Sequence, residues 1–225
     1  GYTVQAHDAR GHGERGGPRV LIHAVEDMAR DFGGLCDRIL QERRAPLFVL
    51  GHSLGSLVAI LALATRQKSI AGAILSGNAL EGRSNLPAAA IPVLQLLAGV
   101  FPNVRLLPAL VAKDISTDPA VVEAYESDPL VDRGRWRLAT GSAIMKAIKT
   151  CRDALPPLQV PLFLLHGEQD RMLSIDGAKF AMQHAGSADK ELLVCPDDYH
   201  DPLSGRCKER AVAALIAWLD RHTER

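Results

Sequence analysis

Residues 51–55 read Gly-His-Ser-Leu-Gly, a G-x-S-x-G pattern in which Ser53 is a candidate nucleophile. The pattern follows an apolar run at 46–50 and precedes residues typical of a buried helix, which is the strand-turn-helix context that such a nucleophile requires. The glycines permit a tight turn that lifts the hydroxyl clear of the sheet, and the helix N-terminus directs partial positive charge at a developing oxyanion. The sequence therefore predicts acyl transfer through Ser53.

A histidine must accept the serine proton, because a neutral hydroxyl is a weak nucleophile. Of the eight histidines, His200 follows the last predicted strand and precedes the final helix, where the base is expected if the chain order is serine, acid, histidine. His52 is adjacent to the nucleophile and cannot easily turn its ring back onto it. His166 ends an apolar strand, where packing or ordering of a loop is expected. His184 and His222, at a helix end and in a polar tail, are interpreted as surface or packing histidines.

A carboxylate must orient this histidine, and Asp170 is the predicted one. It lies just beyond the predicted strand 161–165, in a loop at the carboxyl edge of the sheet, where sites of open α/β folds gather. Glu168 is the local rival, and Asp197 and Asp198 are rivals near the histidine. The latter pair are too close to it along the chain to reach the imidazole from behind without a special turn, so Asp170 is favoured.

The oxyanion of an acyl-transfer intermediate needs two hydrogen-bond donors. The backbone N–H of Leu54, the residue after the nucleophile, is predicted to supply one. His12-Gly13 resembles the second donor loop but fails on chain order, because only one predicted helix separates it from the strand at 46–50. We expect the second donor to lie outside this sequence. A strand that carries this donor loop would then also be missing, which would leave a gap in the sheet. We therefore expect either a fragment of a longer protein or a sheet whose neighbouring strands close that gap.

The elements that position these residues alternate between strand and helix. The predicted strands are 2–6, 46–50, 71–75, 161–165 and, more weakly, 191–194, and the predicted helices are 25–43, 57–65, 176–184 and 208–222. Continuous apolar runs such as 46–50 are typical of parallel strands covered on both faces. The fold class is therefore α/β, with a mostly parallel sheet, right-handed crossovers and flanking helices.

The stretch 86–154 breaks this rhythm, since it contains no convincing strand and several helices. It is interpreted as an inserted helical cap. Its first part, 86–101, is nearly all apolar yet interrupted by Pro87 and Pro92, and it is too short to cross a bilayer comfortably. Two alternatives remain for it: a lid whose apolar face covers an acyl pocket or touches a lipid surface, or a buried helix. The predicted division is core 1–79, cap 80–154 and continued core 155–225.

Composition narrows the functional class. The 225 residues include 26 basic and 26 acidic side chains, so no net field and no basic stripe favour nucleic acid. The four cysteines show no paired spacing and are predicted to be free thiols in a reducing compartment; they are Cys36, Cys151, Cys195 and Cys207. Nothing at the start signals secretion, although Gly1 is not an initiator methionine. We expect a cytoplasmic protein with no cofactor and no metal.

Together these motifs resemble the monoacylglycerol lipase and lysophospholipase branch of the α/β-hydrolases over nearly the whole chain. The matching segments are the strand and D-x-x-G-H-G loop at 1–13, the elbow at 51–55, the cap motif Ser-Asp-Pro-Leu at 127–130, the acid loop Leu-His-Gly-Glu-Gln-Asp at 165–170 and the histidine loop Tyr199-His200. The chain departs from the family pattern at Arg15, where a serine is common, and at Asp201-Pro202 after the histidine. The resemblance implies an α/β-hydrolase fold, with its N-terminal strands absent from this sequence.

The implied triad is Ser53, Asp170 and His200. The implied reaction is hydrolysis of a carboxylic ester of a single-chain lipid, a monoacylglycerol or lysophospholipid, through an acyl-enzyme and without a cofactor. The implied partners are a small lipid ester and, through the cap, the surface of a membrane. Two alternatives stay open: a truncated or non-catalytic scaffold that binds lipid or a partner, and acyl transfer or thioester cleavage on the same triad.

Overall fold

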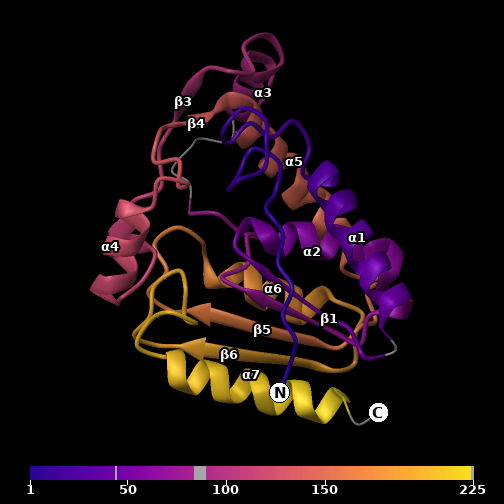
Figure 1. The fold of residues 1–225 in the computed structure, drawn as a ribbon. Coiled ribbons are helices and arrows are strands. Elements are labelled where there is room, and N and C mark those ends of the chain that lie inside the picture. Colours follow the sequence, from indigo (N-terminus) through magenta and orange to yellow (C-terminus); the bar gives the residue numbers. More distant parts are fainter. Residues whose placement is uncertain (44, 84–89, 224–225) are drawn as a thin grey trace.

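The structure, a computed structural model, describes residues 1–43, 45–83 and 90–223 (Figure 1). Its strands are β1 (Phe48–His52), β2 (Gly72–Ser76), β3 (Arg105–Leu107), β4 (Trp136–Arg137), β5 (Leu162–Gly167) and β6 (Lys190–Cys195). Its helices are α1 (Val25–Glu42), α2 (Leu54–Arg66), α3 (Ala90–Val100), α4 (Pro119–Ser127), α5 (Leu138–Ala154), α6 (Ile175–His184) and α7 (Lys208–Thr223), with 3-10 turns η1 (Gln67–Ser69) and η2 (Ala112–Asp114). The expected alternation of strand and helix is confirmed.

The main sheet contains four parallel strands in the order β1-β2-β5-β6. Its register pairs His52 with Ser76 and Ser76 with Leu165, so β1 and β2 end level with one another and β5 continues to Gly167. Because parallel strands all end at the same edge, the loops that follow β1, β2, β5 and β6 meet there. This edge is where the sequence places its candidate residues.

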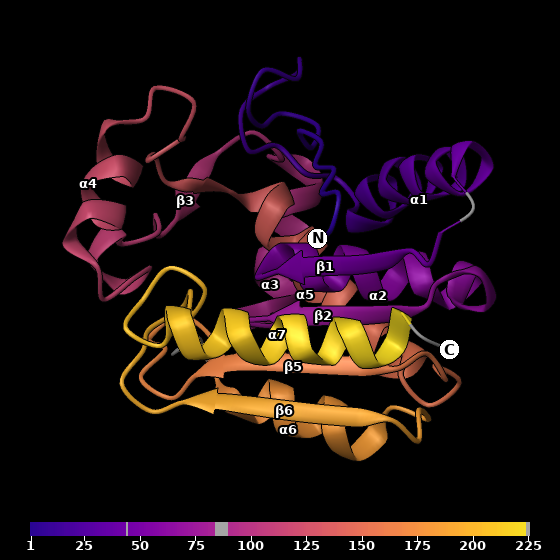
Figure 2. The ribbon, with the colours of Figure 1, turned by 60° about the horizontal axis from the view of Figure 1, so that its bottom comes forward.

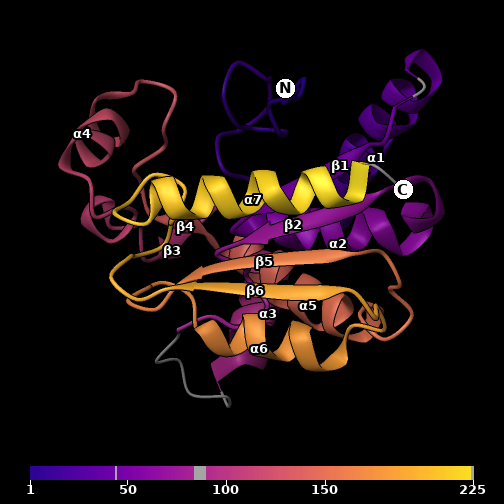
Figure 3. The same cartoon turned by 90° about the horizontal axis from the view of Figure 1, so that it is seen from below.

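Helices cover both faces of the sheet, with α7 on one face and α2 and α6 on the other (Figure 3). Alternate residues of one strand point to opposite faces: Ile74 packs with Trp218 of α7, whereas Leu75 packs in the core beneath α2. Every residue of β2 and β5 is buried, which explains why these strands read as continuous apolar runs. The predicted α/β class is confirmed.

Helix α5 packs against α2 through small side chains that allow a close approach. Ala143, Ala147 and Cys151 are buried there, and the Cys151 thiol donates to the carbonyl of Leu57 at 3.5 Å. These three residues belong to the main hydrophobic core, although their helix lies within the range 80–154 that the sequence assigns to the cap. The exact division into core and cap stays a prediction.

In the remaining part of the cap, α4 lies beyond the carboxyl ends of the strands, whereas α3 packs on α5 behind the sheet (Figure 2). The expectation that the cap contains no strand is wrong, because β3 and β4 pair antiparallel. These strands are only three and two residues long, and arginine side chains add polar contacts around them, with Arg105 on Asp132 and Arg135 on the carbonyl of Leu106. Such pairing leaves little signal in hydrophobic periodicity.

Helix α3 settles one of the two alternatives for the apolar stretch. Only Ala98 of this helix is buried, whereas Val93, Leu96 and Val100 are exposed, Leu96 by 70%. A buried helix is therefore the wrong interpretation of residues 90–100. Pro87 and the other residues of 86–89 lie outside the described part of the chain. Among the described residues, no helix is long and apolar enough to cross a bilayer.

The predicted strand at 2–6 is also wrong. These residues are extended but exposed, Val4 by 86%, and the segment is tied to α7 by the hydroxyl of Tyr2, which donates to Asp220 at 2.5 Å. A strand needs the backbone groups of a neighbour, and β1 pairs only with β2 among the described residues. The neighbouring segments therefore do not close the sheet at this edge.

The cysteine prediction is wrong for two of four residues. Cys195 and Cys207 form a disulfide with their Cα atoms 5.9 Å apart, while Cys36 and Cys151 are free and buried. The chain between the bonded cysteines turns back on itself and brings the end of β6 beside the start of α7. A separation of 12 residues gives no hint of this approach in the sequence.

Thr140 fastens the segment before α1 to α5. Its buried hydroxyl donates to the carbonyl of Val20 at 2.6 Å and accepts from the N–H of Ile22 at 3.1 Å. Thr140→Val keeps the shape but leaves both backbone groups unsatisfied, so we expect the free energy of unfolding to fall by about 2 kcal/mol. Urea unfolding measures this, with Thr150→Val as the control. Equal losses in both variants would contradict the assignment.

Candidate active site

Ser53 occupies a sharp turn between β1 and α2, with φ 53° and ψ −123°. A positive φ is strained for a residue with a side chain, and surrounding contacts must hold it. The N–H of Ser53 donates to the carbonyl of Ser76 at 3.0 Å, and the hydroxyl of Ser56 donates to the carbonyl of Ser53 at 2.6 Å. A Cβ at Gly51 would collide with the carbonyl of Gly55, so only glycine fits there. The local geometry is that of a nucleophile elbow.

Asp170 and His200 form a buried hydrogen-bonded pair at the same edge of the sheet. Asp170 follows β5 and is 1% exposed; His200 lies between β6 and α7 and is 5% exposed. Their Nδ1 and Oδ2 atoms are 2.8 Å apart. The other oxygen of Asp170 accepts from the N–H groups of Met172 at 2.8 Å and Leu173 at 3.0 Å. The structure therefore brings together the predicted acid and the predicted base.

The pKa of Asp170 reflects two opposed influences. Burial alone would raise it, but the hydrogen bond and charge of His200, helped by the two backbone N–H groups, outweigh burial and lower the pKa. The carboxylate is therefore ionised at neutral pH. An ionised carboxylate on Nδ1 fixes the ring orientation and stabilises an imidazolium.

Ser53 and His200 both lie in the described part of the chain, and no hydrogen bond joins them. The His200 ring instead lies tilted against the ring of His52, with the ring centroids 4.7 Å apart. Its other neighbour is Gly77, where a Cβ would stand 3.3 Å from the imidazole. Contacts of this kind often tighten only when substrate is bound. The predicted base thus lies beside the elbow and forms no hydrogen bond to the predicted nucleophile.

His52 is a neutral neighbour of the base. Burial and the proximity of His200 lower its pKa from 6.5 to about 4, and its Nδ1 lies 3.4 Å from the hydroxyl of Ser76. Its ring packs on that of His200, the predicted base. Sequence reasoning set His52 aside as a rival base and did not find this contact.

The other rivals lie elsewhere. His166 is fully buried with Nε2 3.6 Å from Asp170, and burial lowers its pKa, so it packs neutral beneath the acid. The ring of His184 stacks on Phe180, and that of His222 contacts Asp189. Glu168 is exposed, and Asp198 faces away from His200 toward other partners described below. Gly77 was missed, and its only signal is its position directly after a buried strand.

Leu54 is the first residue of α2, where N–H groups have no acceptor within the helix. Its N–H is therefore available to an oxyanion, as the sequence expects, and the assignment stays a prediction. His12 bonds the carbonyl of Arg10 within its own loop at 2.9 Å. That the second donor lies outside this sequence also stays a prediction.

One cluster has the side chains of a metal site. The ligand atoms of Cys195, Asp198 and Cys207 lie within 4.8 Å of one another. The two sulfur atoms are bonded to each other, so they offer no thiolate, and the carboxylate already accepts three hydrogen bonds. The geometry supports a structural cluster here.

The parallel sheet covered by helices on both faces, with an elbow at the end of one strand, defines an α/β-hydrolase. The family model described as "Serine aminopeptidase, S33" matches residues 1–206, and the chain belongs to this family of hydrolases. The monoacylglycerol lipase branch that the motifs resemble lies among its relatives.

Three known proteins illustrate this likeness. Monoacylglycerol lipase of Mycolicibacterium smegmatis is 27% identical over 223 residues, which cover 99% of this chain and 79% of the relative. Human monoglyceride lipase is 33% identical over 212 residues, with 88% of this chain and 65% of the relative covered. The crystal structure of Paleococcus ferrophilus monoacylglycerol lipase superposes with a TM-score of 0.81 at 26% identity, covering 94% of this chain and 80% of that one. The chain thus spans about two thirds to four fifths of these proteins.

The low pKa of His52 predicts a pH-dependent stability. The unfolded chain binds a proton at this histidine below about pH 6.5, whereas the folded chain does so only near pH 4. Stability is therefore lost as pH falls through this window, and His52→Gln should remove about 2–3 kcal/mol of that loss. Urea unfolding at pH 7 and pH 4.5 measures it, with exposed His23→Gln as the control. An unchanged pH slope in His52→Gln would refute the argument.

Proposed function

We propose that this protein hydrolyses carboxylic esters of single-chain lipids, monoacylglycerols above all, through an acyl-enzyme on Ser53. The observation that carries the proposal is the buried pair of His200 and Asp170 beside the strained turn at Ser53. The names of relatives support the substrate class, since several are monoacylglycerol or monoglyceride lipases.

In the proposed mechanism, the Ser53 hydroxyl oxygen attacks the ester carbonyl while the His200 ring takes its proton. Asp170 stabilises the resulting imidazolium, and the N–H of Leu54 binds the oxyanion. The intermediate collapses as His200 gives its proton to the departing glycerol oxygen. Water, deprotonated by His200, then attacks the acyl-enzyme and releases a fatty acid with the serine restored.

We also propose that the cap contacts a lipid surface. Its exposed apolar residues form what we call the apolar cap surface, which comprises Val93, Leu96, Val100, Phe101, Val104, Leu106, Leu110 and Val111. Exposed apolar side chains gathered on one region mark an interaction site. A lipid substrate that is poorly soluble in water supplies the physical reason for such a surface on the cap.

Replacement of the triad tests the reaction. Ser53→Ala should abolish both hydrolysis of a monoacylglycerol and labelling by a fluorophosphonate, and Asp170→Asn should lower kcat by about 10⁴-fold because the imidazole loses its orienting partner. The exposed Ser127→Ala in the cap is the matched control. Labelling that persists in Ser53→Ala would overturn the nucleophile assignment.

The same assay separates the competing functions. A wild-type chain that is labelled, releases no fatty acid and forms no labelled acylglycerol from isotopically labelled glycerol acts as neither esterase nor acyltransferase. Cleavage of aminoacyl amides in preference to esters would favour the peptidase activity that the family description names. Absence of labelling together with lipid binding would identify a non-catalytic scaffold.

Charge on the apolar cap surface tests the membrane contact. Val93→Glu with Leu96→Glu should reduce co-flotation with phosphatidylcholine vesicles severalfold, because each charge must be desolvated at the interface. Val212→Glu with Ile216→Glu places the same charges on exposed apolar positions of α7 and is the control. Equal flotation of both double variants would exclude the cap as the contact.

A further inference from the structure

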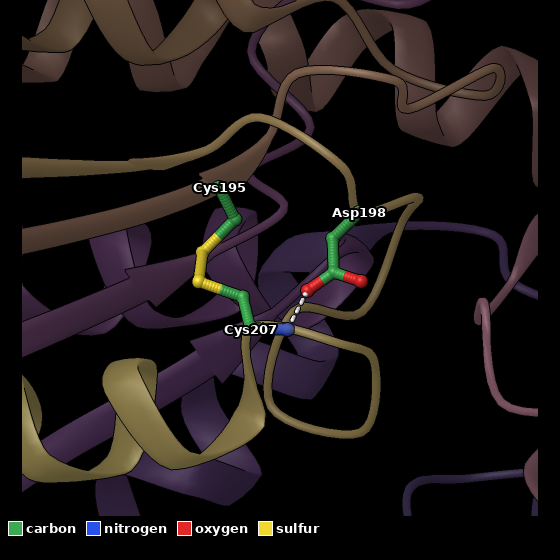
Figure 4. Close-up of side chains that lie close together, drawn as sticks. All are labelled: Cys195, Asp198 and Cys207. Atoms are coloured by element: carbon green, nitrogen blue, oxygen red, sulfur yellow. Dashed lines mark hydrogen bonds between the residues drawn. A yellow bond between two sulfur atoms is a disulfide. The ribbon is translucent and has the colours of Figure 1, made fainter.

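A buried carboxylate fills the loop that carries His200. This histidine loop, residues 196–206, is closed at its base by the disulfide between Cys195 and Cys207, and Asp198 points into it (Figure 4). Its Oδ2 accepts from the N–H of Cys207 at 2.6 Å, and its Oδ1 accepts from the N–H of Arg206 at 2.7 Å. A third donor, the hydroxyl of Thr117, binds Oδ1 at 2.8 Å.

No cation balances this carboxylate. Within the described part of the chain, Asp198 forms no ion pair with a lysine, arginine or histidine, and its side chain is wholly buried. Two of its three donors are N–H groups directly before α7, where the helix dipole favours negative charge. Burying a carboxylate costs free energy, and an apolar side chain would fill the same space at a lower cost. The presence of a carboxylate is explained if fixed hydrogen-bond directions are required there.

The main chain at Asp198 extends the same contacts to the acid. Its carbonyl accepts from the N–H of Gln169 at 3.0 Å, one residue before Asp170. Two glycines make this packing possible: a Cβ at Gly167 would collide with the histidine loop, and one at Gly205 would collide with the carboxylate itself. Asp198 therefore joins the acid loop, the histidine loop and the start of α7.

The cap contributes the remaining contacts. Residues 114–117 run along the histidine loop: the N–H of His200 donates to the carbonyl of Asp114 at 3.4 Å, and the N–H of Asp201 donates to that of Ile115 at 2.8 Å. The Thr117 hydroxyl binds Asp198 and also accepts from Arg206. The cap thus touches the loop at the catalytic histidine and at the buried carboxylate.

We propose that Asp198 is a positioning residue that sets His200 against Asp170 and transmits the placement of cap residues 114–117 to the base. The inference rests on the proposed function, in which His200 is the base. The hydrogen bonds of Asp198 go to Thr117, Arg206, Cys207, Cys195 and Gln169, and not to Ser53 or the His200 ring. Asp198 acts by holding the loop in one geometry from three sides.

Asp198→Asn tests this role with a side chain of the same size. Its amide turns a donor toward backbone donors, so we expect kcat for a water-soluble ester to fall by about tenfold to a hundredfold. KM should stay within about threefold, because a displaced base weakens the transition state and not substrate binding. Asp197→Asn makes the same chemical change at an exposed neighbour and should leave both constants unchanged. Wild-type kcat in Asp198→Asn overturns the proposal.

Thr117→Val tests the hydrogen bond from the cap to Asp198. It also keeps the proposal testable if Asp198→Asn does not fold. It keeps the charge and removes one donor, so kcat should fall by about threefold to tenfold at constant KM. The double variant should lose less than the product of the two single losses, because both act on one contact. Wild-type kcat in Thr117→Val overturns the transmission from the cap.

A readout independent of turnover separates this proposal from the proposed function. The proton between His200 and Asp170 is expected to give a far-downfield NMR resonance that His200→Gln removes. The resonance should persist in Asp197→Asn and be lost or broadened in Asp198→Asn at unchanged far-UV circular dichroism. If the wild type cleaves no ester, the proposed function fails, yet a resonance unaffected by Asp198→Asn still overturns the positioning role.

Discussion

The hydrogen bond between Asp170 and His200 joins two loops that leave different strands of one sheet. It forms only because β5 and β6 are parallel neighbours, so that their following loops begin at the same edge. Burial strengthens the hydrogen bond that the carboxylate of Asp170 makes, but a buried carboxylate is stable only if its oxygens are hydrogen-bonded. The two backbone N–H groups of the acid loop meet the second condition. The geometry of that loop, the end of β6 and the packing beneath them all serve this bond.

Close backbone approach is the second constraint at this edge. A Cβ at Gly77 or Gly167 would strike the backbone of the histidine loop, one at Gly51 would strike the first turn of α2, and one at Gly205 would strike the carboxylate of Asp198. Gly51 and Gly167 lie at the ends of β1 and β5, Gly77 directly follows β2, and Gly205 lies in the histidine loop. Loops packed so tightly have few alternative arrangements, which holds a site at its working geometry. Small side chains are thus used where position matters more than burial of apolar surface.

Much of this architecture is predictable from local pattern. Strands such as β1 and β5 are continuous apolar runs. Ser53, Asp170 and His200 follow three strands of one parallel sheet, so their loops are predicted to begin at the same edge. The strands of the cap escape prediction because they are only three and two residues long, which is too short to show a two-residue period. The disulfide and the bond from Thr117 to Asp198 escape it for another reason. Their partners meet through a loop that turns back and through a cap 81 positions away, which no periodicity encodes.

The prediction of a strand at 2–6 is wrong because a strand depends on pairing with a neighbour and not only on the propensity of its residues. Residues 2–6 suit a strand, yet no described neighbour offers them backbone donors and acceptors, and they lie exposed against α7. The opposite holds at Ser53, whose positive φ is disfavoured by about 1–3 kcal/mol and is nevertheless kept by the contacts to Ser76 and Ser56. Tertiary contacts therefore override local preference in both directions. At the elbow the strained turn places Ser53 at the edge of the sheet where the loop of His200, the proposed base, also begins.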